Sequence, residues 1–86
     1  LKTRNIYYTP VEASFQFMEQ PGIVFTGTAD AWVTFEAVKR GCETGGFPLY
    51  VTEDGNHSLE TGAVKRDLEN LREIMRITEE YIAGER

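Results

Sequence analysis

Length, composition and charge limit the classes of protein to which this chain can belong. It has 86 residues, of which 41 % are apolar and 12 % aromatic, and its net charge is −5. A chain of this length forms one domain, and this apolar content is typical of a folded protein rather than a disordered one. Its negative charge disfavours nonspecific binding to nucleic-acid phosphates or to anionic membranes. We therefore expect a single folded domain over residues 1–86.

Cysteine and histidine each occur once, as Cys42 and His57. A lone cysteine cannot form an internal disulfide, and one cysteine with one histidine makes a structural zinc site improbable. The sequence contains no apolar run of membrane-spanning length and no signal-peptide pattern, and its single thiol suits a reducing compartment, so we expect a cytoplasmic protein. The chain begins at Leu1 rather than Met, which leaves a processed or truncated N-terminus open.

The first third of the chain has the patterns of strands and tight turns. Apolar and polar residues alternate over residues 11–17, which predicts a strand with one buried face. Pro21 and Gly22 favour a type II turn, and residues 23–26 are rich in β-branched and aromatic side chains. We therefore predict a β-hairpin there. Residues 5–9 are predicted to form a further short strand or an extended arm.

The middle of the chain predicts a helix followed by a strand. Thr28 or Asp30 can cap the helix, and Gly45 and Gly46 mark its end. Its core-facing stripe consists of Ala31, Phe35, Val38 and Cys42. Residues 47–52 are predicted to form the next strand, and residues 57–59 can pair back as a short fourth strand.

These elements give the order ββαβα, or ββαββα if the fourth strand forms. Either order predicts an α+β fold with a small antiparallel or mixed sheet, two helices on one face of that sheet, and a long C-terminal helix.

The C-terminal helix is predicted over residues 61–83 and carries two apolar stripes. Such a helix would be roughly 34 Å long, whereas the whole domain would be only about 30 Å across. The main stripe, expected to pack on the sheet, consists of Val64, Leu68, Leu71, Met75, Thr78 and Ile82. Ile74, Ile77 and Tyr81 form a second stripe beside it. The helix therefore has more apolar surface than its own sheet needs. This predicts that a protein partner or a second copy of the chain covers the second stripe.

Tyr7 and Tyr8 extend this hypothesis to the N-terminal segment. Neighbouring residues of an extended chain point to opposite faces, so at least one ring is expected to face outward. Tyrosine is common in binding surfaces, although an edge strand with one ring on the core explains the pair equally well.

A nucleic-acid contact is the main alternative. Lys39, Arg40, Lys65 and Arg66 would form a basic patch if the two helices lay side by side. The bases of the long helix also have acidic partners three or four residues away, so solvated salt bridges explain most of them.

Metal binding and catalysis find little support in the sequence. The polar segment formed by Asp54, Asn56, His57, Ser58 and Glu60 lacks the spacing of an EF-hand loop, and a hairpin turn explains it. Cys42 and His57 could form a thiolate pair, but Cys42 lies on an apolar stripe where thiols are usually inert. We therefore expect no catalytic, cofactor-binding or metal-binding residues.

The leading hypothesis is a small, acidic, non-enzymatic module that binds another protein and forms a homodimer through its C-terminal helix. Adaptors, regulatory subunits and inhibitors belong to this class. The alternatives are a nucleic-acid-associated module using the basic patch and an accessory subunit of a larger enzyme.

Overall fold

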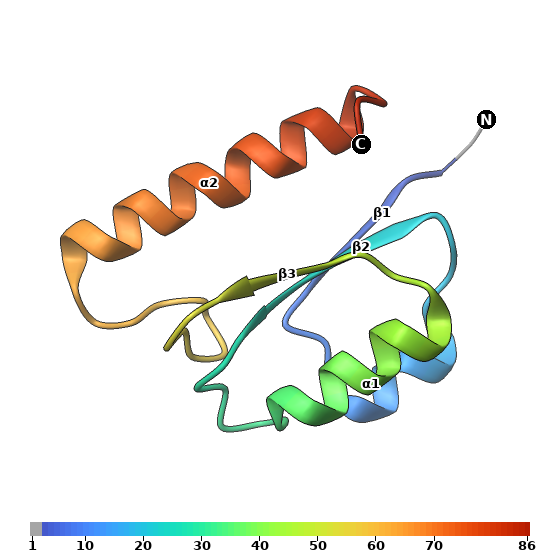
Figure 1. Ribbon diagram of the computed structural model, residues 1–86, viewed down its shortest axis with the longest axis horizontal. Helices are drawn as coiled ribbons and strands as arrows, with labels where there is room; N and C mark the ends of the chain where they lie inside the picture. The colour runs from blue at the N-terminus through green and yellow to red at the C-terminus, as the bar shows by residue number, and fades with distance from the viewer. Residues whose placement is uncertain (1–2) are drawn as a thin grey trace.

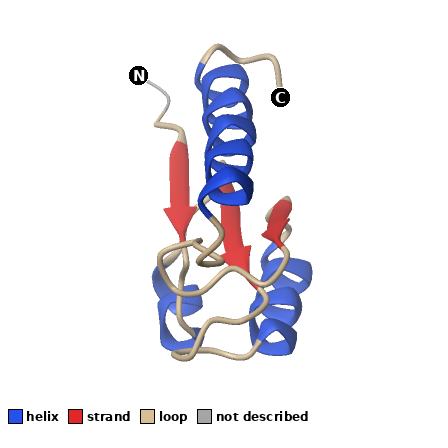
Figure 2. Ribbon diagram, turned by 90° about the vertical axis from the view of Figure 1, so that its left-hand side faces the viewer, coloured by secondary structure: helices blue, strands red, loops and turns tan. Residues whose placement is uncertain are grey.

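The computed structural model describes residues 3–86, which form three strands, two α-helices and one 3₁₀-helix (Figure 1). The elements in chain order are β1 (Asn5–Tyr8), η1 (Glu12–Phe17), β2 (Gly22–Gly27), α1 (Phe35–Gly45), β3 (Leu49–Thr52) and α2 (Val64–Ile82). The predicted order ββαβα roughly fits, and the α+β architecture with a long C-terminal helix is confirmed. The three strands lie side by side in the order β1-β2-β3 (Figure 2).

The sheet is parallel throughout the described residues, so the prediction of an antiparallel or mixed sheet is wrong. Strand β2 is central and all of its residues are buried. Its sequence, Gly-Ile-Val-Phe-Thr-Gly, is a short apolar run without alternation, as expected for a strand covered on both faces. Pairing places Ile6 beside Ile23 in one ladder and Val24 beside Leu49 in the other.

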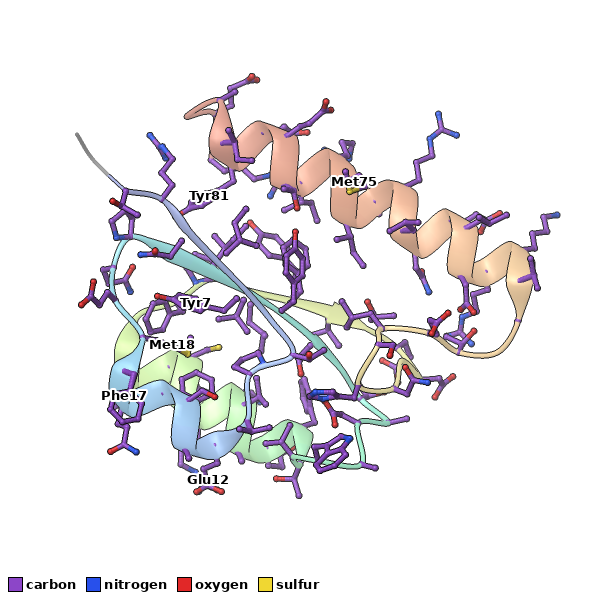
Figure 3. All side chains as sticks on the ribbon, turned by 180° about the vertical axis from the view of Figure 1, so that it is seen from behind. Tyr7, Glu12, Phe17, Met18, Met75 and Tyr81 are labelled. Atoms are coloured by element: carbon purple, nitrogen blue, oxygen red, sulfur yellow. The ribbon has the colours of Figure 1, made fainter. Side chains whose placement is uncertain are left out.

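The predicted hairpin is replaced by a crossover connection over residues 9–21. Parallel neighbours require such a connection, because the chain must return to the starting edge of the sheet. Part of it is η1, which lies where a strand was predicted over residues 11–17. Helical spacing of three places Phe15 and Met18 on the same side, toward α1, and leaves Phe17 exposed (Figure 3). Gly41 permits this contact, since a Cβ there would lie 2.7 Å from the Phe15 ring.

The two α-helices cover opposite faces of the sheet, so the expectation that both lie on one face is also wrong (Figure 1). Neighbouring residues of β2 point to opposite faces. The buried cluster on the α1 face contains Val24, Val38, Cys42 and Phe47. The cluster on the α2 face contains Ile23, Phe25, Ile74, Ile77 and Tyr81. Figure 3 shows Tyr7 and Tyr81 on these two opposite sides.

Helix α1 begins later than predicted. Thr34 is its N-cap, and its hydroxyl accepts a hydrogen bond from the Ala37 N–H at 3.2 Å. The carboxylate of Asp30 instead accepts a hydrogen bond from the Trp32 N–H, which closes an Asx turn over residues 30–32. Residues 28–34 are therefore a loop, and neither Thr28 nor Asp30 caps the helix. Gly46, with a φ of 74°, ends α1 as expected.

Helix α2 confirms the predicted long C-terminal helix, but its second stripe is buried, and of the main stripe only Thr78 is buried. Ile74, Ile77 and Tyr81 are buried on the sheet. The exposed apolar residues of α2 are Val64, Leu68, Leu71, Met75 and Ile82. The first turns of α2 extend past the end of β3, so the sheet covers mainly the second half of the helix (Figure 1).

Residues 57–59, predicted as a possible fourth strand, form turns between β3 and α2. The side chain of Asn56 accepts hydrogen bonds from the N–H groups of Ser58 and Glu60, at 2.8 and 3.1 Å, and curls the chain. Among residues 3–86, no helix is long and apolar enough to cross a membrane.

Candidate active site

The parallel sheet brings together two residues that the sequence analysis kept apart. Asp30 lies in the loop after β2, and His57 lies in the loop after β3. Because β2 and β3 are adjacent and parallel, both loops leave the same edge of the sheet. His57 Nδ1 lies 2.8 Å from Asp30 Oδ2, within hydrogen-bond distance.

Backbone contacts hold these two loops against each other. The Ala29 N–H donates to the Gly55 carbonyl at 2.9 Å, and the Asp54 N–H donates to the Thr28 hydroxyl at 2.7 Å. The approach is so close that a Cβ on Gly27 would lie 2.1 Å from the Gly55 carbonyl oxygen. Glycine at position 27 is therefore required for the geometry that aligns Asp30 with His57.

The Asp30 carboxylate is the buried partner of the pair. Its side chain has 0 % of its surface exposed. Oδ1 accepts the Trp32 N–H at 2.7 Å, and Oδ2 faces the imidazole. An ionised carboxylate only accepts hydrogen bonds, so Nδ1 of His57 must carry the proton between them. The contact thus fixes both the orientation and the tautomer of the imidazole.

His57 keeps its other nitrogen free for chemistry. Its side chain is 42 % exposed, and within residues 3–86 no hydrogen bond reaches Nε2. With Nδ1 protonated, Nε2 has an available lone pair and can accept a proton. A buried aspartate that orients a histidine in this way is also found in nucleophilic catalytic triads.

The nucleophile of such a triad is not seen among the described residues. Cys42 packs with Val24 and Phe47 in the cluster on the α1 face, and burial raises the pKa of its thiol to about 11. It therefore remains protonated and inert at neutral pH. Neither Ser14 nor Ser58 is hydrogen-bonded to His57 in the described structure.

An apolar groove of about 590 Å³ adjoins the imidazole. It lies between the first half of α2, the end of β1 and the loop that carries His57. Its lining includes Tyr8, His57, Leu59, Leu68, Leu71 and Met75. One wall of this groove therefore consists of exposed apolar residues of α2, namely Val64, Leu68, Leu71 and Met75.

The predicted contact residues are divided between the core and the edge of this groove. Ile74, Ile77 and Tyr81 are buried against the sheet, and Ile74 also lines the groove. Tyr7 packs edge-on against Phe47 on the α1 face.

Tyr8 lies on the opposite face, half-exposed, beside the groove. Its ring stacks on Phe25, and its hydroxyl lies 3.2 Å from the Thr78 hydroxyl.

The predicted basic patch is not assembled within one chain. Lys39 and Arg40 belong to α1, whereas Lys65 and Arg66 belong to α2, on the other face of the sheet (Figure 1). Arg66 binds locally instead, to the Asp54 carboxylate at 3.2 Å and to the Glu53 carbonyl at 3.0 Å.

The polar segment from Asp54 to Glu60 acts as a folded turn. Asn56 uses its side-chain oxygen for backbone N–H groups, and His57 is directed to Asp30. Across residues 3–86, no three His, Cys, Asp or Glu side chains gather as a set of metal ligands.

The sequence carries a signal for Asp30 and His57, although local patterns favour a helix cap for the first and a turn for the second. Each residue follows a short apolar segment, the first over residues 22–27 and the second over residues 49–52. If both segments are taken as adjacent parallel strands, their carboxyl ends bring the two residues together. Treating the first segment as half of a hairpin concealed this juxtaposition.

Comparison with protein-family models, with curated proteins and with solved structures finds no match to this chain.

Proposed function

We propose that His57 is the general base, and Asp30 the residue that orients it, in a hydrolase site that carries out acyl transfer. The observation that carries this proposal is the 2.8 Å contact between His57 Nδ1 and a fully buried Asp30 carboxylate, at the carboxyl edge of a parallel sheet. Ligand sites in open sheets of this kind occur at this edge. The proposal departs from the expected non-enzymatic function. Asp30 and His57 are far apart in the sequence and meet only when β2 and β3 are parallel neighbours.

The chemistry follows from the two nitrogens of the imidazole. Nε2 of His57 accepts the proton of an attacking hydroxyl, thiol or water, whose oxygen or sulfur bonds to the substrate's carbonyl carbon. The bond from that carbon to the leaving group then breaks, and Nε2 returns the proton to the leaving group. Asp30 stabilises the imidazolium that exists between these two transfers.

The order of the residues suggests where the nucleophile comes from. In α/β-hydrolase sites the chain order is nucleophile, then acid, then histidine, each near the carboxyl end of a strand. Asp30 and His57 follow β2 and β3 in that order. We therefore propose that the attacking group is water or a nucleophile of a partner polypeptide. The second case matches the expected alternative of an accessory subunit.

The experiment is ester hydrolysis by the 86-residue chain itself, with 4-nitrophenyl acetate and water as the attacking group. His57 is the only histidine, so His57→Gln removes every imidazole. We expect hydrolysis faster per imidazole than with free 4-methylimidazole, and its loss in His57→Gln. Asp54→Asn changes an exposed acid at the same edge and serves as the matched control. An unchanged rate in His57→Gln contradicts the proposal.

A second candidate function is protein binding through the exposed stripe of α2, defined here as Val64, Leu68, Leu71 and Met75. Each of these side chains is more than half exposed. Four apolar residues along one face of a helix form a patch of the kind that binding partners cover. This observation keeps the expected protein-binding or homodimeric function as a proposal, and it moves the proposed contact from Ile74, Ile77 and Tyr81 to this stripe.

Light scattering tests the second candidate. Leu71→Glu should leave the monomer folded, because Leu71 is exposed, and should abolish any self-association. Ile77→Glu is the contrasting variant, since it places a charge in the core and should unfold the chain. A dimer mass that Leu71→Glu leaves unchanged would count against this stripe as the contact.

A further inference from the structure

Trp32 presents its ring beside the proposed base. Its residue surface is 74 % exposed, although tryptophan is usually well buried. Its ring centroid lies 5.9 Å from that of the His57 imidazole, and the two ring planes are inclined by 50°. A large apolar surface is thus exposed next to the imidazole of the proposed base.

The position of Trp32 is tied to the acid as well as to the base. Its backbone N–H donates to Asp30 Oδ1, while Asp30 Oδ2 holds His57. The same carboxylate therefore fixes the indole-bearing residue and the imidazole relative to each other. Because this bond uses the backbone, replacing the indole leaves the contact with Asp30 in place.

The surroundings of Trp32 define what the indole can contact. Asp30, Trp32 and Glu12 line a shallow hollow of about 530 Å³ at the start of α1. This volume is large enough for an aromatic ring. The Glu12 carboxylate makes the hollow unfavourable for anions, so negatively charged aromatic groups are disfavoured there.

We propose that Trp32 is the residue that selects the substrate, by stacking on an uncharged planar aromatic group next to the scissile ester bond. This inference rests on the proposed function of Asp30 and His57 and adds the substrate class. Aromatic faces attract one another in offset-stacked and edge-to-face arrangements beyond the effect of buried area. The indole and imidazole ring centroids are 5.9 Å apart, so an aryl group stacked on the indole lies beside His57.

The test compares two activated acetate esters that differ in the ring. 4-Nitrophenyl acetate supplies an aromatic leaving group, and 2,2,2-trifluoroethyl acetate supplies none. Each rate is divided by the rate with free 4-methylimidazole, which removes the intrinsic reactivity of the ester. Trp32→Ala should lower this ratio roughly 2- to 12-fold for the aryl ester and leave it unchanged for the alkyl ester. Trp32→Phe, which keeps an aromatic face, should retain most of the selectivity.

The outcomes separate this inference from the function on which it rests. If His57→Gln abolishes hydrolysis of both esters but Trp32→Ala alters neither ratio, or lowers both equally, the selection by Trp32 is overturned and the function stands. If His57→Gln leaves both rates unchanged, the proposed function itself fails. Circular dichroism checks that each variant is folded, as expected for the replacement of an exposed side chain.

Discussion

The two ends of the parallel sheet use polar side chains in opposite ways. At the amino end, the Tyr7 hydroxyl accepts a hydrogen bond from the Glu19 N–H at 2.9 Å, and the Gln20 amide donates to the Gly45 carbonyl at 2.7 Å. The Asn5 amide donates to the Glu19 carbonyl at 3.2 Å. These side chains bind backbone groups of the loops that lead into the strands, and such bonds hold the fold together.

At the carboxyl end, polar groups also close turns, but one of them, the Asp30 carboxylate, orients a second side chain as well. Asp30 fixes His57 through one nitrogen, and within residues 3–86 the other nitrogen has no partner. The exposed ring of Trp32 lies beside it. The difference teaches that polar side chains stabilise loops at the amino end, whereas at the carboxyl end they orient the imidazole to which we assign the proposed chemistry.

A variant in the centre of the sheet should affect both ends at once. Phe25 in β2 is 1 % exposed, stacks on Tyr8 and packs against Tyr50. Phe25→Ala should lower the free energy of unfolding by about 3–5 kcal/mol, because it removes a large ring and leaves a cavity. Urea denaturation measures the change. A loss of unfolding free energy below about 1 kcal/mol would contradict the central role of Phe25 in the core.

Asp30→Asn should affect both stability and chemistry. It weakens a buried charge-assisted hydrogen bond and should cost about 1–3 kcal/mol. Because the amide no longer enforces the Nδ1–H tautomer, ester hydrolysis should fall roughly 10-fold or more. Asp54→Asn, in an exposed pair with Arg66, should change the free energy of unfolding by less than about 0.5 kcal/mol and leave the rate unchanged. If Asp30→Asn and Asp54→Asn changed stability and hydrolysis equally, the buried carboxylate would have no role beyond that of an exposed one.

Tyr7→Phe should affect stability alone. It deletes the hydroxyl that binds Glu19 and keeps the ring that packs on Phe47. The expected cost is about 0.5–1.5 kcal/mol of unfolding free energy, with no change in the rate of ester hydrolysis. Thermal unfolding and the ester assay provide the two readouts. A slower rate in the folded variant would show that the amino end also serves the chemistry.

The smallest effect concerns the start of α2 and depends on pH. A hydrogen bond from the Thr61 hydroxyl, helped by the Thr61 and Gly62 N–H groups, holds the pKa of Asp67 below its usual range. A lowered pKa in the folded state means that this stabilisation is present above about pH 4 and is lost as the pH falls through the folded value. Asp67→Asn should therefore flatten the acid side of the stability curve. An identical curve in both proteins would contradict this role.

Helices and strands that depend on local sequence patterns could be predicted from the sequence. Their arrangement in the sheet could not. The periodicity of residues 61–83 predicts α2, and β-branched residues predict β2 and β3. The choice between parallel and antiparallel pairing depends on contacts between distant segments, such as Phe15 of η1 against Gly41 of α1. The Pro-Gly pair favoured a hairpin locally, and the crossover overrode this preference.

The candidate site was missed for the same reason. Asp30 and His57 are ordinary polar loop residues until β2 and β3 are known to be parallel neighbours. The two stripes of α2 could be recognised from their spacing, but the sheet decides which one is covered. Ile74, Ile77 and Tyr81 meet Ile23 and Phe25, a contact that depends on how α2 crosses the sheet.

The central claim, that Asp30 fixes the tautomer of His57 and frees Nε2, is tested most directly by ¹⁵N NMR of the only histidine in the chain. Correlations between the ring nitrogens and the ring protons identify which nitrogen carries hydrogen in the neutral imidazole. The account predicts a protonated Nδ1 and an unprotonated Nε2, with this preference lost in Asp30→Asn. A neutral His57 that carries its proton on Nε2, in the wild-type chain, would contradict it.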